Sequence, residues 1–322
     1  MSPDVSPWPE LAFLVPPGEV RDWRMVLLYD AAVDNGLVDA LPASAADLAA
    51  DRGLAAHAVG VVLDGLALWD IVTVVDDGVY APGPAAPDAD ATAVLRHHAR
   101  AIRGWSAITE RVRGVPPDPN RMTPGGVEIM LDALAVMGRG SAPDAVDACL
   151  AAAAGAGAAT VLDLGGGHGQ FAAEFARRGL RVVLQDRPEV IDLVRHKGWL
   201  DGTGVELFGG DFFETSPDEA FDIVFCAGVV YTMDGERVVR LLRRVRPLIA
   251  PGGHLAVHTF LRDTDELATL FSAQMLGGVA GGQSHGEDDL RRWFADAGLR
   301  TVATRRLSRR PEWMLFAAPG AT

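Results

Sequence analysis

Apolar residues in the second half of the chain form short continuous runs, and segments with helical spacing of apolar positions separate them. Such runs are typical of strands buried on both faces, as in parallel sheets. The predicted strands cover residues 160–164, 181–186, 204–214, 221–228, 254–261, 299–304 and 313–318. Helices are predicted over residues 170–178, 236–246, 264–276 and 288–297, the last with a capping box formed by Ser284 and Glu287. This alternation predicts an α/β domain around a mostly parallel sheet of seven strands.

The first half of the chain has a different pattern, in which apolar positions recur every three or four residues. It predicts helices over residues 19–41, 45–52 and 55–68, followed by a hairpin with strands 71–75 and 79–80. Ser44 and Asp47 fit an N-terminal capping pattern, and Asp77-Gly78 favours a tight turn. This order of elements is that of a winged helix. After a Pro/Ala/Asp linker, further helices are predicted over residues 94–113, 126–137 and 143–153.

Composition narrows the classes of partner. The 43 acidic residues outnumber the 29 basic ones, which gives a net charge of −14. This balance disfavours nucleic acid and anionic membranes as partners. Segment 55–64, where a winged helix would read DNA, contains neither Lys nor Arg. We therefore predict a structural winged helix, and a ligand-sensing DNA-binding regulator stays as an alternative.

Other features of the chain indicate a protein of the cytoplasm. No run of about 18 apolar residues lacks charges, and the N-terminus does not resemble a signal peptide. The only cysteines, Cys149 and Cys226, are too far apart in sequence to suggest a metal or redox pair, and no metal site is predicted. Residues 1–18 are rich in proline, and they fit either an arm that covers a partner or a pocket, or a disordered tail.

A glycine-rich turn follows the first strand of the α/β half. Gly165, Gly166, Gly167 and Gly169 surround His168, and a helical segment begins directly afterwards. Glycine lets a ligand approach the backbone closely, and free amides at the start of the helix favour polar groups. Asp186 ends the second strand 17 residues after Gly169, about where a ribose-binding carboxylate is expected. The turn alone is a weak signal, because several nucleotide-binding folds share it.

Five motifs in order make the pattern specific: LDLGGGHG, LQDRPEV, GGDFFE, FDIVFCAGVV and APGGHLAVH. Together they resemble the class I S-adenosylmethionine (SAM) methyltransferases, and within them the small-molecule O-methyltransferases with an N-terminal winged-helix dimerisation domain. The resemblance covers most of the chain. It implies a Rossmann-like SAM-binding domain, SAM as cofactor with S-adenosylhomocysteine (SAH) as product, a small-molecule acceptor and a homodimer. The implied division is a dimerisation region over 1–93, a helical roof over 94–153 and a catalytic domain over 154–322.

The resemblance also assigns roles to residues. The glycines allow close approach of the cofactor, Asp186 would hold its ribose, and Asp163 would contact its ammonium group. Asp211 and Phe212 would flank the adenine. The full cofactor set is Asp163, Gly165, Gly167, Gly169, Asp186, Asp211 and Phe212. The walls of the substrate pocket are expected to include Trp105, Met122, Met130, Met137 and Met275.

The acceptor side departs from the family pattern. Many relatives carry a catalytic histidine after the fourth strand, where this chain has Tyr231, a poor base at neutral pH. Thr259 replaces a later acid, and Ser284-His285 replaces a Glu-Arg pair. His258 and His285 are therefore candidate substitutes for the base, with Tyr231 as the third catalytic candidate. O-methylation of an aromatic or polyketide-like natural product is the leading hypothesis. C-methylation, or a non-methylating reaction such as hydroxylation or cyclisation by a SAM-binding relative, stays open.

Overall fold

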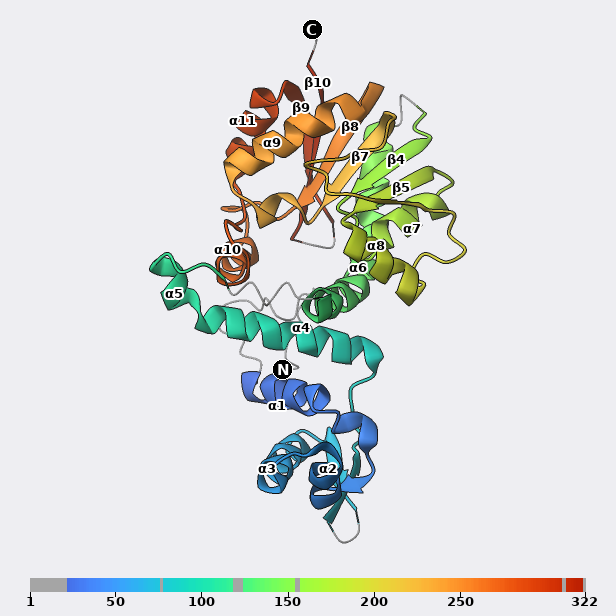
Figure 1. Cartoon of the computed structure of the whole chain (residues 1–322). Coiled ribbons are helices and arrows are strands. Elements are labelled where there is room, and N and C mark those ends of the chain that lie inside the picture. Colours follow the sequence, from blue (N-terminus) through green and yellow to red (C-terminus); the bar gives the residue numbers. More distant parts are fainter. Residues whose placement is uncertain (1–21, 76–77, 118–123, 154–156, 309–310, 321–322) are drawn as a thin grey trace. The chain divides into compact units, whose positions relative to one another are not determined.

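A computed structural model describes residues 22–75, 78–117, 124–153, 157–308 and 311–320 (Figure 1). The chain forms two compact units, one within Glu19–Arg103 and the other within Gly104–Thr322. The helix α4 (Ala89–Ser106) begins in the first unit and ends in the second. The proline-rich arm over residues 1–18 and the pocket candidate Met122 lie outside the described residues.

The N-terminal unit has the predicted winged-helix order. Its helices are α1 (Trp23–Asp34), α2 (Ala45–Arg52) and α3 (Ala56–Ala67), and its small sheet has the order β1 (Ala43–Ser44), β3 (Val79–Pro82), β2 (Val72–Val74). Strands β2 and β3 are antiparallel, with Val74 opposite Tyr80, so the predicted hairpin is confirmed. The amide of Asp47 donates to Ser44 Oγ at 3.1 Å, as the capping pattern indicated. Helix α1 is shorter than predicted because Gly36, at a φ of 65°, ends it.

Two predicted helices over residues 126–137 and 143–153 are one helix, α6 (Pro124–Ala153). The sequence predicts a separation over residues 138–142, yet Pro143 lies inside the continuous helix, where a proline costs about 3 kcal/mol. The helix continues because Ala142, Ala145 and Val146 are buried in the core against the sheet. The hydroxyl of Ser141 also donates to the carbonyl of Gly138 at 3.3 Å. The preceding predicted helix 94–113 is divided into α4 and α5 (Ile108–Val112).

The C-terminal unit is built on a seven-stranded sheet with the order β6-β5-β4-β7-β8-β10-β9. Strands β4 to β8 pair in parallel, and β10 is antiparallel to both of its neighbours. The predicted α/β fold class is thus confirmed. The strands are β4 (Thr160–Leu164), β5 (Arg181–Asp186), β6 (Glu206–Gly209), β7 (Phe221–Ala227), β8 (Ile249–Thr259), β9 (Leu299–Arg306) and β10 (Trp313–Pro319).

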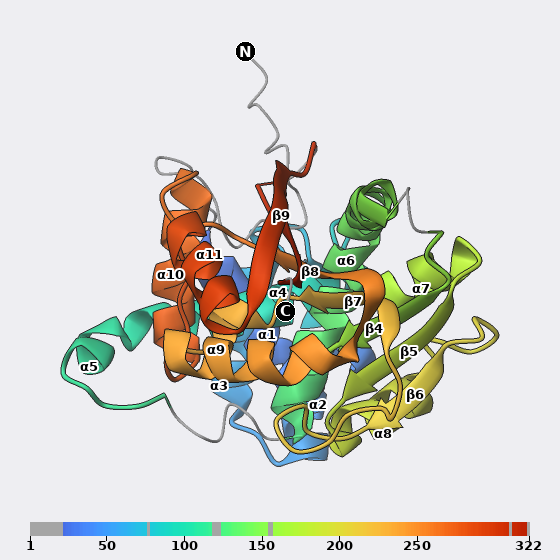
Figure 2. The same ribbon diagram turned by 90° about the horizontal axis from the view of Figure 1, so that it is seen from above.

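Helices cover both faces of this sheet, which Figure 2 shows nearly edge-on. One core contains residues of α6, α7 (Gln170–Arg177) and α8 (Pro188–Lys197). The other contains residues of α9 (Gly235–Val245) and α11 (Glu287–Asp296). Alternate residues of each central strand face opposite cores, as Val224 and Phe225 do in β7. The long apolar runs of the sequence therefore reflect burial on both faces.

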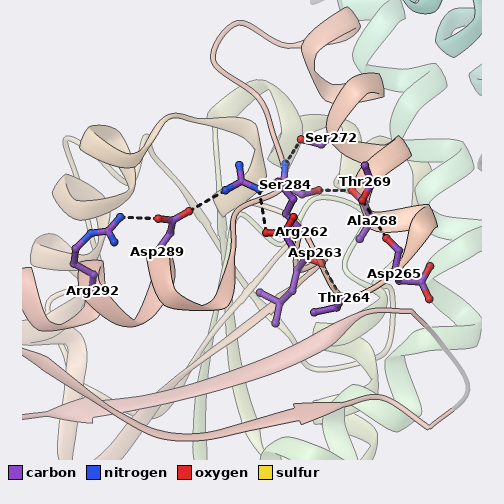
Figure 3. Close-up of polar contacts among 11 residues, drawn as sticks. Arg262, Asp263, Thr264, Asp265, Ala268, Thr269, Ser272, Ser284, Asp289 and Arg292 are labelled. Carbon is purple, nitrogen blue, oxygen red and sulfur yellow. Dashed lines mark hydrogen bonds and ion pairs between the residues drawn. The ribbon is translucent and has the colours of Figure 1, made fainter.

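The predicted capping box at α11 is wrong. Gly286 occupies the N-cap position, and no side chain caps the helix there. Ser284 instead turns toward α10 (Glu266–Gly278), where its Oγ donates to the carbonyl of Ala268 at 3.1 Å (Figure 3). Its amide donates to Ser272 Oγ at 3.2 Å. The Ser-x-x-Glu pattern is local, whereas the structure uses the serine to join two segments that are distant in sequence.

Candidate active site

The glycine turn forms a tight bend between the end of β4 and the start of α7. Gly165, Gly167 and Gly169 have φ values of 71°, 52° and 79°, which side chains rarely adopt. A Cβ atom on Gly165 would lie 2.7 Å from Val229, and one on Gly169 would lie 2.7 Å from Leu200. The turn therefore requires glycine for conformation and for space, as the sequence indicated.

Asp186 lies against this turn at the carboxyl end of β5. Its Oδ2 accepts from the amide of Gly167 at 2.9 Å, and its Oδ1 accepts from the amide of Arg187 at 2.8 Å. Burial raises the pKa of Asp186, although both amides favour the ionised form. A carboxylate can accept about four hydrogen bonds, so lone pairs remain for the hydroxyl groups of a ribose.

Asp163 lies beneath the turn and is completely buried. Its Cγ would be 2.9 Å from a Cβ atom on Gly166. Burial, with a smaller contribution from the Asp186 carboxylate, raises the pKa of Asp163 to about 7. Neither carboxyl oxygen makes a well-formed hydrogen bond with a described residue. The amide of Ala172 favours the ionised form only weakly, and a buried carboxylate with so few partners is costly, a cost that a cation at the turn would compensate.

The loop after β6 brings an aromatic ring to the same turn. Phe212 Cε1 lies 3.7 Å from the position of a Cβ atom on Gly165. The carboxylate of Asp211 is exposed and accepts from the amide of Phe213 at 2.8 Å. Gln185 holds the loop, because its Nε2 donates to the carbonyl of Thr215 at 2.8 Å. The structure thus places Asp163, the glycines, Asp186 and Phe212 close together at the carboxyl ends of the parallel strands.

Sequence reasoning missed Gln185, which is fully buried in β5. Its backbone carbonyl accepts from the amides of Gly165 at 2.8 Å and Gly166 at 3.3 Å, while its side chain reaches the loop after β6. The available signal was an amide side chain within an otherwise apolar run. Buried polar side chains generally require specific partners.

Helix α6 lies against the glycine turn. Leu131 Cδ2 lies 3.2 Å from the position of a Cβ atom on Gly167. Gly138 lies against the His168 ring, since a Cβ there would be 2.8 Å from its Cε1. Lys197 of α8 pairs with Glu128 at 2.7 Å and with Asp132 at 3.1 Å, which anchors α6 beside the turn.

The described pocket candidates are spread over three helices. Met130 and Met137 lie on α6, where Met137 is buried and Met130 packs against the core. Met275 is half-buried on α10, and Trp105, near the end of α4, is exposed. Gly104 packs against α10, because a Cβ atom on Gly277 would lie 2.7 Å from its carbonyl oxygen. Their place in a common acceptor pocket stays a proposal.

Tyr231 follows β7 in the turn Val230–Thr232. Its ring contacts Phe271 of α10 edge-on, with centroids 4.7 Å apart, and its hydroxyl lies 2.9 Å from the position of a Cβ atom on Gly228. Burial, assisted by the carboxylate of Glu312, raises the pKa of Tyr231 above its ordinary range. The hydroxyl is therefore protonated at neutral pH and suits a hydrogen-bond donor, not a base.

His285 is buried behind the Tyr231 turn. Its Nε2 lies 3.1 Å from the carbonyl of Val230 and 3.0 Å from that of Met233. Because both partners are acceptors, Nε2 must carry the proton and donate. The ring also packs edge-on against Trp293, with centroids 4.8 Å apart, and burial lowers its pKa. This geometry favours a positioning role for His285 over the proton transfer that the sequence suggested.

His258, the remaining catalytic candidate, lies near the end of β8. It is buried, and its ring centroid is 5.4 Å from that of Phe171 in α7. Burial lowers the pKa of His258 to about 4. The imidazole is therefore neutral at physiological pH, and no described residue accepts from or donates to its Nε2.

The described part of the chain contains neither a metal-binding cluster nor a membrane-spanning helix. Within the ranges given above, no three His, Cys, Asp or Glu side chains form a group that could hold a metal ion. Among the helices described, none is long and apolar enough to cross a membrane.

Comparison with known proteins identifies the protein family to which this chain belongs. Residues 99–304 match the family model described as a methyltransferase domain. The structure of a mitomycin 7-O-methyltransferase superposes on this chain with a TM-score of 0.74 and 24% sequence identity. The match covers 92% of this chain and 94% of the methyltransferase chain, so the two share a fold. The fold and the glycine turn are thus those of a Rossmann-like methyltransferase. This chain belongs to the methyltransferase domain family, and the family predicted from its motifs is confirmed.

Two curated relatives from Streptomyces resemble parts of the sequence. The mitomycin biosynthesis 6-O-methyltransferase of Streptomyces lavendulae is 38% identical over 151 residues, which are 45% of this chain and 42% of that protein. The chain thus matches less than half the length of this relative. The 3-amino-4-hydroxybenzoate 4-O-methyltransferase of Streptomyces cremeus is 28% identical over 309 residues, which are 86% of this chain and 82% of that protein.

Proposed function

We propose that this protein transfers the methyl group of SAM to a hydroxyl oxygen of a small aromatic natural product. The observation that carries the proposal is the junction of Asp186, Phe212 and the glycine turn at one edge of the sheet. The family match supports methyl transfer. Both curated relatives are named as O-methyltransferases, one of a hydroxybenzoate, which supports an aromatic hydroxyl as acceptor.

The residues present fit the cofactor. Asp186 would accept from the ribose hydroxyls, Phe212 would stack on the adenine, and Asp211 would accept from its amino group. The backbone of Gly165, Gly167 and Gly169 would admit the amino-acid portion. The Asp163 carboxyl, buried without a well-formed hydrogen bond, suits a cationic ammonium close to the turn. SAM supplies a methyl group on a positively charged sulfur that is already a good leaving group.

The acceptor side supports positioning rather than strong base catalysis. Tyr231 holds its proton, and Nε2 of His285 donates to two carbonyls. A phenol that ionises by itself, or that loses its proton to water, needs only to be aligned with the methyl group. Alignment can lower a barrier by several kcal/mol. C-methylation and non-methylating chemistry are the alternatives that a product analysis would reveal.

Incubation with labelled SAM and a panel of hydroxybenzoates and hydroxyquinones tests this function. We expect label in an O-methyl ether, identified by mass spectrometry, together with SAH. Label on ring carbon would replace O-methylation by C-methylation. Consumption of an acceptor without transfer of label would point to non-methylating chemistry, and failure to bind SAH would refute the proposal altogether.

We also propose a cytoplasmic homodimer formed through residues 1–93 and the roof helices over 94–153, with catalysis in 154–322. Trp23 and Leu68 support this proposal, since they are 55% and 80% exposed on the N-terminal unit. An obligate interface of this kind buries more than about 2,000 Å². A monomer by light scattering at micromolar concentration would contradict it.

A further inference from the structure

A hollow of about 540 Å³ lies at the end of the catalytic sheet where the parallel strand β8 begins, opposite the end that carries the glycine turn. Ile249 lines it at the start of β8, Arg300 near the start of β9, and Pro319 at the end of antiparallel β10. The glycine turn follows the carboxyl end of β4, so the parallel strands separate the hollow from the SAM site. Its volume is in the range of small-molecule sites.

Three arginines line this hollow: Arg243 and Arg246 at the end of α9, and Arg300 of β9. Within the described part of the chain, none of them forms an ion pair, and no acidic side chain lines the hollow. This is unusual in a protein with 43 acidic residues and 29 basic ones. A concave surface lined by one sign of charge concentrates ions of the opposite sign.

Two of these guanidinium groups have defined positions. Arg243 donates from Nε and Nη2 to the carbonyl of Asp296, at 3.4 and 3.2 Å. The guanidinium of Arg246 lies over Gly298, with its Cζ 3.3 Å from the position of a Cβ atom there. The helix C-terminus favours basic residues on α9 but does not account for Arg300, which comes from another element.

We propose that this arginine hollow binds a phosphate ester of a small organic molecule. Planar guanidinium groups match phosphate oxygens in pairs, and three of them suit a group with more than one negative charge. Between the arginines the walls are apolar, formed by Pro247, Pro251, Ala318 and Pro319. These walls would contact the organic part of the ester. The site is independent of methyl transfer, since none of its residues contributes to the glycine turn.

Calorimetric titration with pyrophosphate and with phenyl phosphate tests the proposal. We expect both to bind, and Arg246→Gln and Arg300→Gln each to weaken binding at least tenfold. Arg240→Gln is the matched control, because Arg240 lies on α9 outside the hollow and packs over Phe213. It should change binding by less than twofold. Unchanged SAH affinity in all three variants would show that they are folded.

Each other result overturns part or all of the proposal. Absence of binding to the wild-type protein would refute the site, and equal weakening by Arg240→Gln would show only diffuse attraction to basic residues. Binding of pyrophosphate but not of phenyl phosphate would replace the ester by an inorganic anion. Because SAH binding is measured separately, its failure would affect the proposed function and not this site.

Discussion

Replacement of Asp186 by alanine is the most direct test of the cofactor site. Its carboxylate accepts from the amides of Gly167 and Arg187, and in the proposed complex also from the ribose. A hydrogen bond to a charged group is worth roughly 1.5–3 kcal/mol. Loss of one such bond to the ribose should therefore raise the dissociation constant of SAH about 10- to 150-fold. Relaxation of the Gly167 amide would add to this loss.

The assay is isothermal titration of SAH into wild-type protein and Asp186→Ala. Glu189→Ala provides the control, because Glu189 is an exposed acid at the start of α8 that pairs with Arg187 at 3.0 Å. Its loss should leave SAH affinity within about twofold, as exposed pairs contribute about 0–1 kcal/mol. Equal affinities of Asp186→Ala and wild type, with both folded, would refute the ribose contact.

Four further predictions concern Asp163, Tyr231 and His285. The pKa of Asp163 is raised from 3.8 to about 7, so the unfolded chain loses this proton at lower pH than the unliganded fold does, and the fold loses stability progressively between about pH 4 and pH 7. Asp163→Asn should therefore raise the melting temperature more at pH 8, where the loss is complete, than at pH 5. An ammonium contact requires ionised Asp163, so SAH affinity should fall as pH falls below about 7, and the same slope in Asp163→Asn would disprove the contact. Tyr231→Phe should keep methyl transfer within about tenfold, because the protonated hydroxyl is not a base, and complete loss would place proton transfer there after all. His285→Ala should reduce the rate of methyl transfer more than His285→Gln does, because glutamine retains a donor for the carbonyls of Val230 and Met233. Equal loss of rate in both variants, together with an altered pH–rate profile, would instead identify His285 as the base.

The sequence predicted best those features that depend on local chemistry or on burial. The glycine turn is one example, since the positive φ angles of Gly165, Gly167 and Gly169 are a local demand. The parallel strands are another, because burial on both faces leaves continuous apolar runs. Asp186 could be placed because the end of one parallel strand lies beside the end of the next.

The predictions that were wrong, or that changed, depend on distant segments. Ser284 fits a cap locally, but the carbonyl of Ala268 in α10 competes for its hydroxyl. A proline such as Pro143 usually ends a helix, but α6 continues through it because the residues around it are buried against the sheet. His285 has the pKa range of a base in isolation, yet two carbonyls from a turn more than 50 residues away define its tautomer. None of these partners is adjacent in sequence.

Gln185 links the two halves of the cofactor site, and this has a consequence for how the protein tolerates change. Its Oε1 is buried without a hydrogen bond to any described residue, and an unpaired acceptor costs about 1–3 kcal/mol. A leucine there would suit the apolar strand and keep the backbone carbonyl that holds Gly165, yet it would release the loop that carries Phe212. Such a change would thus leave the strand intact but weaken the proposed contact of Phe212 with SAM, because both hydrogen bonds from Gln185 Nε2 to the loop would be lost.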